Sequence, residues 1–174
     1  VSFGGCYGGA IERYDHRTGE RRSVVAWPQL AIGQAPKDLK YRIQWNAPIL
    51  ISRHDARTLY HAAQVLLKST DEGATWTEIS PDLTRNEKAT QGYSGGPITF
   101  DNTGVEVYGT IFALAESPTE AGTIWAGTDD GHVCVTQNGG AVWVKVDVPG
   151  RSEWVTRVEA DAALQPVPQG RLRV

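Results

Sequence analysis

Two copies of one segment lie within this chain of 174 residues, and this internal repeat constrains the fold more than any other sequence feature. The segment from Pro48, PILISRHDARTLYHAAQVLLKSTDEGATWTEI, aligns with the segment from Ala113, ALAESPTEAGTIWAGTDDGHVCVTQNGGAVWVKV, with one gap of two residues. The alignment places Trp76 on Trp143. Repeats of about this length are typical of folds in which one small unit packs on the next.

Each copy is expected to form four short strands, because short apolar runs alternate with turns rich in Gly, Asp and Asn. The first copy predicts strands at 47–52, 58–63, 65–69 and 75–80, and the second at 109–116, 123–128, 132–136 and 142–147. Four antiparallel strands per repeat are typical of a propeller blade. The sequence therefore predicts an all-β fold, a β-propeller-like array of four-stranded antiparallel blades.

The flanking segments continue the same cycle. Residues 1–27 are expected to be the last three strands of a blade, with DHRTGE as a hairpin turn. Residues 41–80 and 109–148 are the two complete blades, and 154–160 the first strand of another. This partial propeller of about three blades spans 1–160, and the Pro- and Gly-containing residues 161–174 are predicted to be an irregular tail. Propellers close with about four to eight blades, so the chain is expected to be part of a ring.

One motif within the repeat carries a family resemblance. STDEGATW has the pattern Ser-x-Asp-x-Gly-x-Thr-Trp, and TQNGGAVW is a degenerate second copy with Asn138 at the Asp position. The motif resembles the Asp-box of BNR-repeat propellers, among them sialidases, xyloglucan-cleaving glycosidases and the luminal domains of sortilin-like receptors. Residues 1–160 resemble a bacterial group of sortilin-like or glycosyl-hydrolase-like proteins. The resemblance implies a fragment of a larger exported protein, extracellular or periplasmic.

The motif residues are expected to build the fold rather than to act on a substrate. A short carboxylate such as Asp71 can accept backbone N–H bonds and fix a turn. Gly73 supplies a backbone conformation with positive φ, and Trp76 can bury its ring between blades. The predicted structural residues of the two boxes are Ser69, Asp71, Gly73, Trp76, Asn138, Gly140 and Trp143.

The connection 81–109 is the predicted location of any binding or chemistry. Connections in compact domains are usually about two to six residues long, and longer ones are often functional. Its carboxylates Asp82, Asp101 and Glu106 are the candidate catalytic residues, although no spacing rule selects a pair as in glycoside hydrolysis. On the alternative interpretation, Asp101 and Asn102 cap a turn and Glu106 is merely solvated. The candidate ligand-binding residues are Arg85, Tyr93, Asn102 and Tyr108.

Composition and motifs argue against several other functions. The net charge is −3 and the basic residues are scattered, which does not favour nucleic-acid binding. No apolar run approaches the roughly 20 residues of a membrane-spanning helix. The four histidines and two cysteines show no metal-ligand spacing, so neither a metal nor a cofactor is predicted. The three arginines of a sialidase site have no identifiable counterpart motif.

The predicted function is therefore a propeller-type binding or interaction module with no catalytic activity of its own. The alternative is a glycoside hydrolase fragment that acts on a β-glucan-like polysaccharide through carboxylates of the connection 81–109. The ligand would be a glycan or a protein. An incomplete ring exposes a strand edge and blade faces, which favour association, so a homodimer that completes the propeller is also expected.

Overall fold

The computed structural model describes residues 1–100, 102–148 and 153–160, which form three antiparallel β-sheets. The first sheet contains β1 (Ser2–Gly5), β2 (Ile11–Tyr14) and β3 (Arg21–Ser23). The second contains β4 (Ile49–Ile51), β5 (Leu59–Ala62), β6 (Leu66–Ser69) and β7 (Thr77–Glu78). The third contains β8 (Ile111–Glu116), β9 (Ile124–Thr128), β10 (Val133–Thr136) and β11 (Val144–Val146). Short 3₁₀ helices are η1 (Tyr7–Gly9), η2 (Pro36–Asp38) and η3 (Lys88–Thr90).

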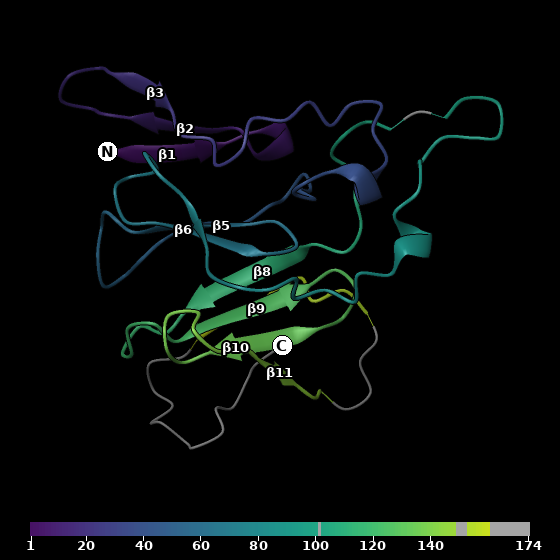
Figure 1. Cartoon of the computed structure of the whole chain (residues 1–174). Coiled ribbons are helices and arrows are strands. Elements are labelled where there is room, and N and C mark those ends of the chain that lie inside the picture. Colours follow the sequence, from purple (N-terminus) through teal and green to yellow (C-terminus); the bar gives the residue numbers. More distant parts are fainter. Residues whose placement is uncertain (101, 149–152, 161–174) are drawn as a thin grey trace.

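Each sheet is a simple meander in which consecutive strands pair. The register of β5 with β6, for example, pairs Leu59 with Ser69 and Ala62 with Leu66. The three sheets succeed one another through the molecule in chain order, from purple to green in Figure 1. Among the described residues no sheet closes into a barrel. The prediction of an all-β fold with antiparallel sheets of three or four strands is confirmed, and the eight strands of the two repeats all lie within their predicted ranges.

The segment 154–160 stays a prediction as a strand. Its described residues contain an isolated bridge residue, Glu159, and the Val155 N–H donates to the Thr128 carbonyl of the preceding sheet at 3.0 Å. Ile111 of β8 makes the corresponding bond to the Ala63 carbonyl at 2.8 Å. Thr128 and Ala63 are equivalent in the repeat. Residues 154–160 therefore lie where the first strand of a further sheet would begin. The predicted tail 161–174 lies outside the described residues.

The hydrophobic core lies between the sheets rather than within one of them. Burying an aliphatic side chain contributes about 1.5–3 kcal/mol, so these clusters hold the layers together. The largest cluster joins the second and third sheets and contains Tyr60, Ala62, Leu66, Leu83, Ile111, Ile124, Ala126 and Cys134. A second cluster contains Tyr41, Ile43, Ala63, Val65 and Leu67, and a third contains Ala113, Trp125, Val133, Val155 and Val158.

One contact occurs at both junctions between consecutive sheets. The Trp76 indole Nε1–H donates to the Val24 carbonyl at 2.9 Å, and the Trp143 Nε1–H donates to the Ile79 carbonyl at 2.7 Å. Val24 follows β3 and Ile79 follows β7, so each acceptor directly follows the last strand of the preceding sheet. The second sheet therefore contacts the first in the same manner as the third contacts the second.

Two glycines make this repeated approach sterically feasible. A Cβ atom on Gly73 would lie 2.7 Å from the Val24 Cβ, and one on Gly140 would lie 2.4 Å from the Ile79 carbonyl oxygen. Both glycines also have positive φ, +83° and +103°, which side-chain-bearing residues rarely adopt. The Gly of each turn is thus required by the close contact between sheets as well as by its own backbone.

Candidate functional site

The turn 69–76 is organised by the Asp71 carboxylate. Asp71 Oδ1 accepts bonds from the Thr75 N–H and the Ser69 hydroxyl, both at 2.8 Å, and Oδ2 accepts from the Thr75 hydroxyl at 2.7 Å. Ser69 Oγ in turn accepts from the Gly73 N–H at 2.8 Å. The bonds from the Thr75 backbone and hydroxyl, with that from Ser69, lower the pKa of Asp71 to about 2. Both carboxylate oxygens thus act within the turn.

The second turn, 136–143, repeats this pattern with a neutral amide. Asn138 Oδ1 accepts from the Val142 N–H at 2.9 Å and from the Thr136 hydroxyl at 3.0 Å. Thr136 Oγ1 accepts from the Gly140 N–H at 3.0 Å, as Ser69 does in the first copy. Asn138 therefore keeps the acceptor role of Asp71 without its charge.

Among the candidate catalytic carboxylates, Asp82 is held in an ion pair. Its Oδ2 lies 2.9 Å from Nη2 of Arg42, a guanidinium whose side chain is only 4% exposed. Its Oδ1 accepts from both the backbone N–H and the hydroxyl of Thr84. Arg42 Nε also donates to the Gly109 carbonyl at 3.0 Å. Arg42 thus binds both ends of the connection 81–109, and Asp101 lies outside the described residues.

The predicted ligand-binding residues do not form one cluster. Asn102 is buried, and its amide donates to the Gln34 carbonyl at 2.7 Å, which ties the long connection to the segment before η2. Tyr93 is 45% exposed and packs edge-on against Phe100, with ring centroids 5.8 Å apart. The Arg85 N–H donates to Asp130 at 2.7 Å. Burial is the main cause that raises the pKa of Tyr108, and the charge of Arg85 acts against it.

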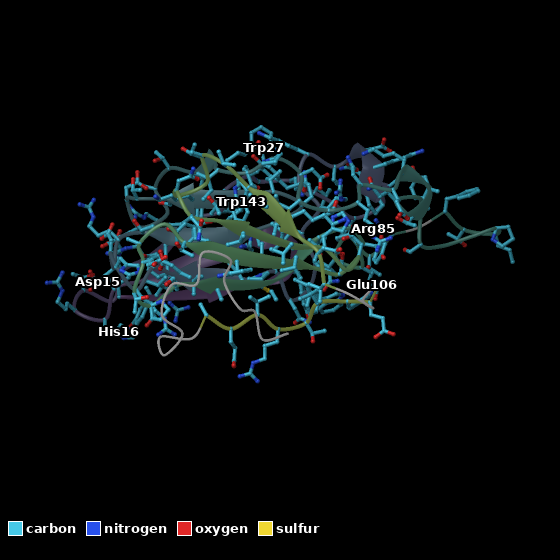
Figure 2. All side chains as sticks on the ribbon, turned by 90° about the horizontal axis from the view of Figure 1, so that it is seen from below. Asp15, His16, Trp27, Arg85, Glu106 and Trp143 are labelled. Carbon is cyan, nitrogen blue, oxygen red and sulfur yellow. The ribbon has the colours of Figure 1, made fainter. Side chains whose placement is uncertain are left out.

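Two of the candidates, Glu106 and Tyr108, line a hollow of about 470 Å³, here called the aromatic groove. It lies where the chain approaches the first strands of successive sheets, since 44–46 precede β4 and 106–108 precede β8. Figure 2 shows Arg85 and Glu106 at one end of the molecule, opposite Asp15 and His16. The groove is lined by Gln44, Trp45, Asn46, Glu106, Val107, Tyr108, Phe112 and Trp154.

A second hollow of about 430 Å³, here called the apolar hollow, shares Trp45 with the aromatic groove. Tyr7 of η1 packs edge-on against Trp45, with ring centroids 4.4 Å apart. The two rings are 61% and 47% exposed. The remaining lining residues of the apolar hollow are Gly8, Gln29, Leu30, Ala31, Ile32, Thr103, Gly104 and Val105.

Asp129 was not among the candidate residues predicted from the sequence. Asp129 is fully buried, and its Oδ1 accepts from the N–H groups of Gly109 and Thr110, at 3.0 and 2.8 Å. Its Oδ2 accepts from the Gln44 amide at 3.4 Å, so it supports a groove residue from behind. Burial raises the pKa of Asp129. Two consecutive acidic residues directly after an apolar strand were the available signal.

Beside the predicted Tyr108, the other aromatic residues of the groove were not among the candidates from the sequence. Trp45 precedes β4, Phe112 lies in β8, and Trp154 begins the segment packed on the third sheet. The rings of Phe112 and Trp154 pack together with centroids 5.5 Å apart. The available signal was an aromatic residue at or just before each expected first strand.

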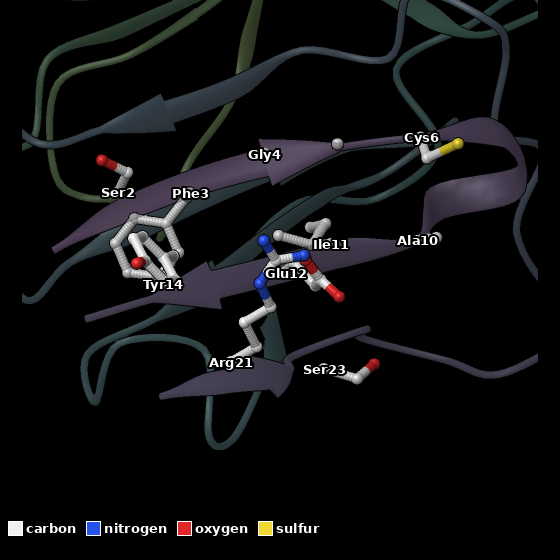
Figure 3. Close-up of a pocket in the computed structure, with 11 residues that line it drawn as sticks. Ser2, Phe3, Gly4, Cys6, Ala10, Ile11, Glu12, Tyr14, Arg21 and Ser23 are labelled. Atoms are coloured by element: carbon white, nitrogen blue, oxygen red, sulfur yellow. The ribbon is translucent and has the colours of Figure 1, made fainter. Parts of the chain in front are cut away.

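A third hollow, of about 590 Å³, covers the outer face of the first sheet (Figure 3). The strand register places Gly4, Glu12 and Ser23 on this face, beside Tyr14 and Arg21. The Arg21 guanidinium lies 5.6 Å from the centroid of the Tyr14 ring. This face is open and carries both polar and apolar groups, in contrast to the apolar junctions between sheets.

The described residues contain no group of three or more His, Cys, Asp or Glu side chains that could hold a metal ion. Both cysteines are free thiols, Cys6 exposed and Cys134 buried. Burial raises the pKa of Cys134 to about 11, so this thiol is not activated. No helix in the described part of the chain is long and apolar enough to cross a membrane.

The sequence matches no protein-family model and no curated protein. Two solved structures are similar in fold. The computationally designed Ika4 protein has 15% identity and a TM-score of 0.50, over 91% of this chain and 72% of Ika4. The GH74 enzyme of Niastella koreensis, NkGH74, has 17% identity and a TM-score of 0.51, over 88% of this chain. The chain covers only 21% of NkGH74, so the likeness concerns the fold of one part of that enzyme.

Proposed function

We propose that this chain is part of a β-propeller and binds a glycan in its aromatic groove. The observation that carries the proposal is the groove itself: aromatic rings from three successive segments surround a hollow that also holds amide and carboxylate side chains. Ligand sites typically combine such apolar walls with a few polar groups that fix orientation.

The propeller arrangement is supported by the repeated junction. Trp76 and Trp143 make the same contact with the preceding sheet, and Val155 repeats the backbone bond that Ile111 makes. An arrangement in which each sheet relates to the next by one operation is the defining property of a radial array. The fold similarity to part of the NkGH74 enzyme agrees with this proposal.

A glycan fits the chemistry of the groove. Trp45 and Trp154 are about half exposed, at 47% and 51%, and offer flat apolar surfaces on which the C–H faces of sugar rings can pack. The exposed amide of Asn46 can both donate to and accept from hydroxyl groups, and the exposed Glu106 can accept from them. A purely apolar ligand would leave these polar groups without partners, which is unfavourable.

The alternative function is that of a glycoside hydrolase fragment. It is favoured by Glu106, an exposed carboxylate that opens onto the groove, and by the similarity to a GH74 enzyme. Glycoside hydrolysis generally requires two carboxyl groups on either side of the bond. Asp82 is paired with Arg42 and Asp129 accepts backbone bonds, so a second free carboxylate would have to come from elsewhere.

Calorimetric titration with cellohexaose and with xyloglucan oligosaccharides tests the proposed binding. Trp45→Ala removes the ring shared by both hollows, and we expect its affinity to fall at least about tenfold, or about 1.4 kcal/mol. Trp27→Ala is the matched control, because Trp27 is 43% exposed but contacts Lys40 outside the groove. Absence of binding at millimolar oligosaccharide, or equal losses in both variants, would refute the proposal.

A reducing-end assay on the same sugars separates binding from hydrolysis. A binding module leaves the oligosaccharides intact, and Glu106→Gln then changes affinity without any change in products. Turnover by the wild-type chain that disappears in Glu106→Gln would instead identify the hydrolase fragment. Turnover that persists in Glu106→Gln would point to a contaminating enzyme and is checked by repeating the purification.

A further inference from the structure

His61 of β5 is buried with one of its ring nitrogens unsatisfied. The residue is 1% exposed, and its Nδ1 lies 3.1 Å from the Pro48 carbonyl oxygen. Its Nε2 has no hydrogen-bond partner, and it is the single buried side-chain polar atom of this kind in the described part of the chain. A buried polar group without a partner is unfavourable, so its position calls for an explanation.

The unsatisfied nitrogen faces the seam between the first and second sheets. A Cβ atom built on Gly9 of η1 would lie 3.5 Å from Nε2 of His61 and 2.5 Å from the Cδ1 methyl group of Ile43. The His61 ring also lies edge-on to the Trp76 ring, with centroids 6.2 Å apart. The imidazole thus lies beside the turn Tyr7–Gly9, the side chain of Ile43 and the indole of Trp76, which joins the two sheets.

Among the described residues, no acidic group is placed to accept a hydrogen bond from a protonated Nε2 of His61. On the elements around His61, the ionisable side chains have other neighbours. Tyr7 packs on Trp45, Glu78 accepts from Tyr41, Lys68 lies over the Tyr60 ring, and Arg42 pairs with Asp82. On the turn that carries Trp76, Asp71 accepts from Thr75 and Glu72 pairs with Arg13. Cys6, next to η1, is exposed. Burial lowers the pKa of His61 to about 4, and only the Pro48 carbonyl opposes that shift.

We propose that His61 is an acid-sensitive latch, in which a second proton on the imidazole expels the turn Tyr7–Gly9 from β5 and opens the seam between the first two sheets. The protonated ring would carry a charge and an N–H donor into a dry contact that offers no acceptor. Opening brings water to Nε2 and removes that cost. Because Nε2 is buried beside Gly9 without a hydrogen-bond partner among the described residues, the closed seam requires the neutral form.

The latch is linked to the proposed ligand site by Tyr7. Its ring packs on Trp45, which lines both the aromatic groove and the apolar hollow. Displacement of η1 would therefore remove one side of the support for Trp45. Release of a glycan on acidification follows, and this second part of the inference rests on the proposed function.

Hydrogen exchange tests the latch in the ligand-free chain. Between pH 6.5 and pH 4, we expect protection factors, corrected for intrinsic rates, to fall by on the order of 10²-fold for amides of the first sheet and η1, such as Cys6 and Val24. Amides of β9 and β10 should change much less. His61→Gln should abolish the difference, whereas His16→Gln, which replaces an exposed histidine that contacts Ser2 and Tyr14 instead, should preserve it. Equal losses in all three sheets, or the same loss in His61→Gln, would overturn the latch.

An NMR titration of the His61 Cε1–H in the wild-type chain does not depend on a variant that folds. We expect the ring to stay neutral well below pH 6.5 while the seam is closed. Titration near pH 6.5 without loss of protection would overturn the proposal. The affinity for cellohexaose is then compared at pH 7 and pH 4.5. No binding at pH 7 refutes only the proposed function, and binding that is unchanged while the seam opens refutes only the coupling.

Discussion

Single residues determine how closely consecutive sheets approach, and Gly140 is the clearest example. An alanine there would place its Cβ 2.4 Å from the Ile79 carbonyl oxygen while it adopts φ of +103°. We expect Gly140→Ala to lower the free energy of unfolding by roughly 2–4 kcal/mol. Gly139→Ala is the matched control, because Gly139 has φ of +68° and open space around its Cβ position. It should cost about 1 kcal/mol. Equal midpoints for both variants in urea denaturation would contradict this account of the junction.

Asp71 offers a residue-scale prediction about pH. Its pKa is lowered in the folded chain from the ordinary value of 3.8 to about 2, so the turn 69–76 contributes its full stability above pH 3.8 and loses it as the pH falls towards 2. Asp71→Asn should retain the acceptor role, as Asn138 does, and lack this acid dependence. Asp71→Ala should lower the melting temperature at pH 7 more than Asp71→Asn does. Thermal melts at pH 7 and pH 3 compare the variants, and identical behaviour of the two would contradict the prediction.

At the residue scale, the sequence predicts hydrogen bonds within a turn but not contacts between segments that are distant in the chain. The hydrogen bonds among Asp71, Ser69 and Gly73 span at most a few residues, so a sequence motif can predict them. Asn102 is fixed by Gln34, and Asp82 by Arg42, through contacts between segments that are far apart in the sequence. No local pattern indicates such partners, and for that reason the carboxylates of the connection 81–109 were candidates until the structure showed Asp82 to be paired.

At the scale of elements, the strands were predictable because their alternation is local and occurs twice. The segment 154–160 has an apolar pattern that fits a strand, and its described residues contain an isolated bridge at Glu159 beside the bond from Val155 to the third sheet. The connection 81–109 resisted prediction. Its path depends on Arg42, Asn102 and Asp129, which bind it to the segments before β4, before η2 and after β9.

Arg42 provides the test of this element-scale account. Its guanidinium is nearly buried and bonds to Asp82, to Thr84 and to the Gly109 carbonyl. Arg42→Ala should lower the free energy of unfolding by about 3–5 kcal/mol, because it leaves polar groups unpaired in a buried site. Arg157→Ala serves as a control for an exposed ion pair with Glu159 and should change stability by less than about 0.5 kcal/mol. Chemical denaturation of both variants decides, and a small effect of Arg42→Ala would mean that other contacts position the connection.

At the scale of the whole molecule, both junctions between consecutive sheets are built in the same way, but the first sheet presents a different outer surface from the other two. The second and third sheets each insert a Trp-bearing turn against the sheet before them. The first sheet has the shorter turn 15–20 in the corresponding place, and its outer face presents Arg21 and Tyr14 instead of an indole. Within the described residues, β1 pairs only with β2. In the part of the chain that the structure describes, this face and edge are therefore open to another chain.

The expected homodimer follows from that open face and edge. An unpaired strand edge and an uncovered sheet favour association, and a stable interface buries about 1,200–2,000 Å² in total. We expect light scattering coupled to size exclusion to give the mass of a dimer. Gly4→Lys should shift the chain towards the monomer, because Gly4 lies on the outer face of the first sheet with nothing within 4 Å of its Cβ position, so the substitution does not strain the fold. Gly92→Lys is the matched control, at a glycine that is equally open but lies in the long connection. A folded wild-type monomer would exclude ring completion by a second copy, and a dimer unaffected by Gly4→Lys would place the interface on another surface.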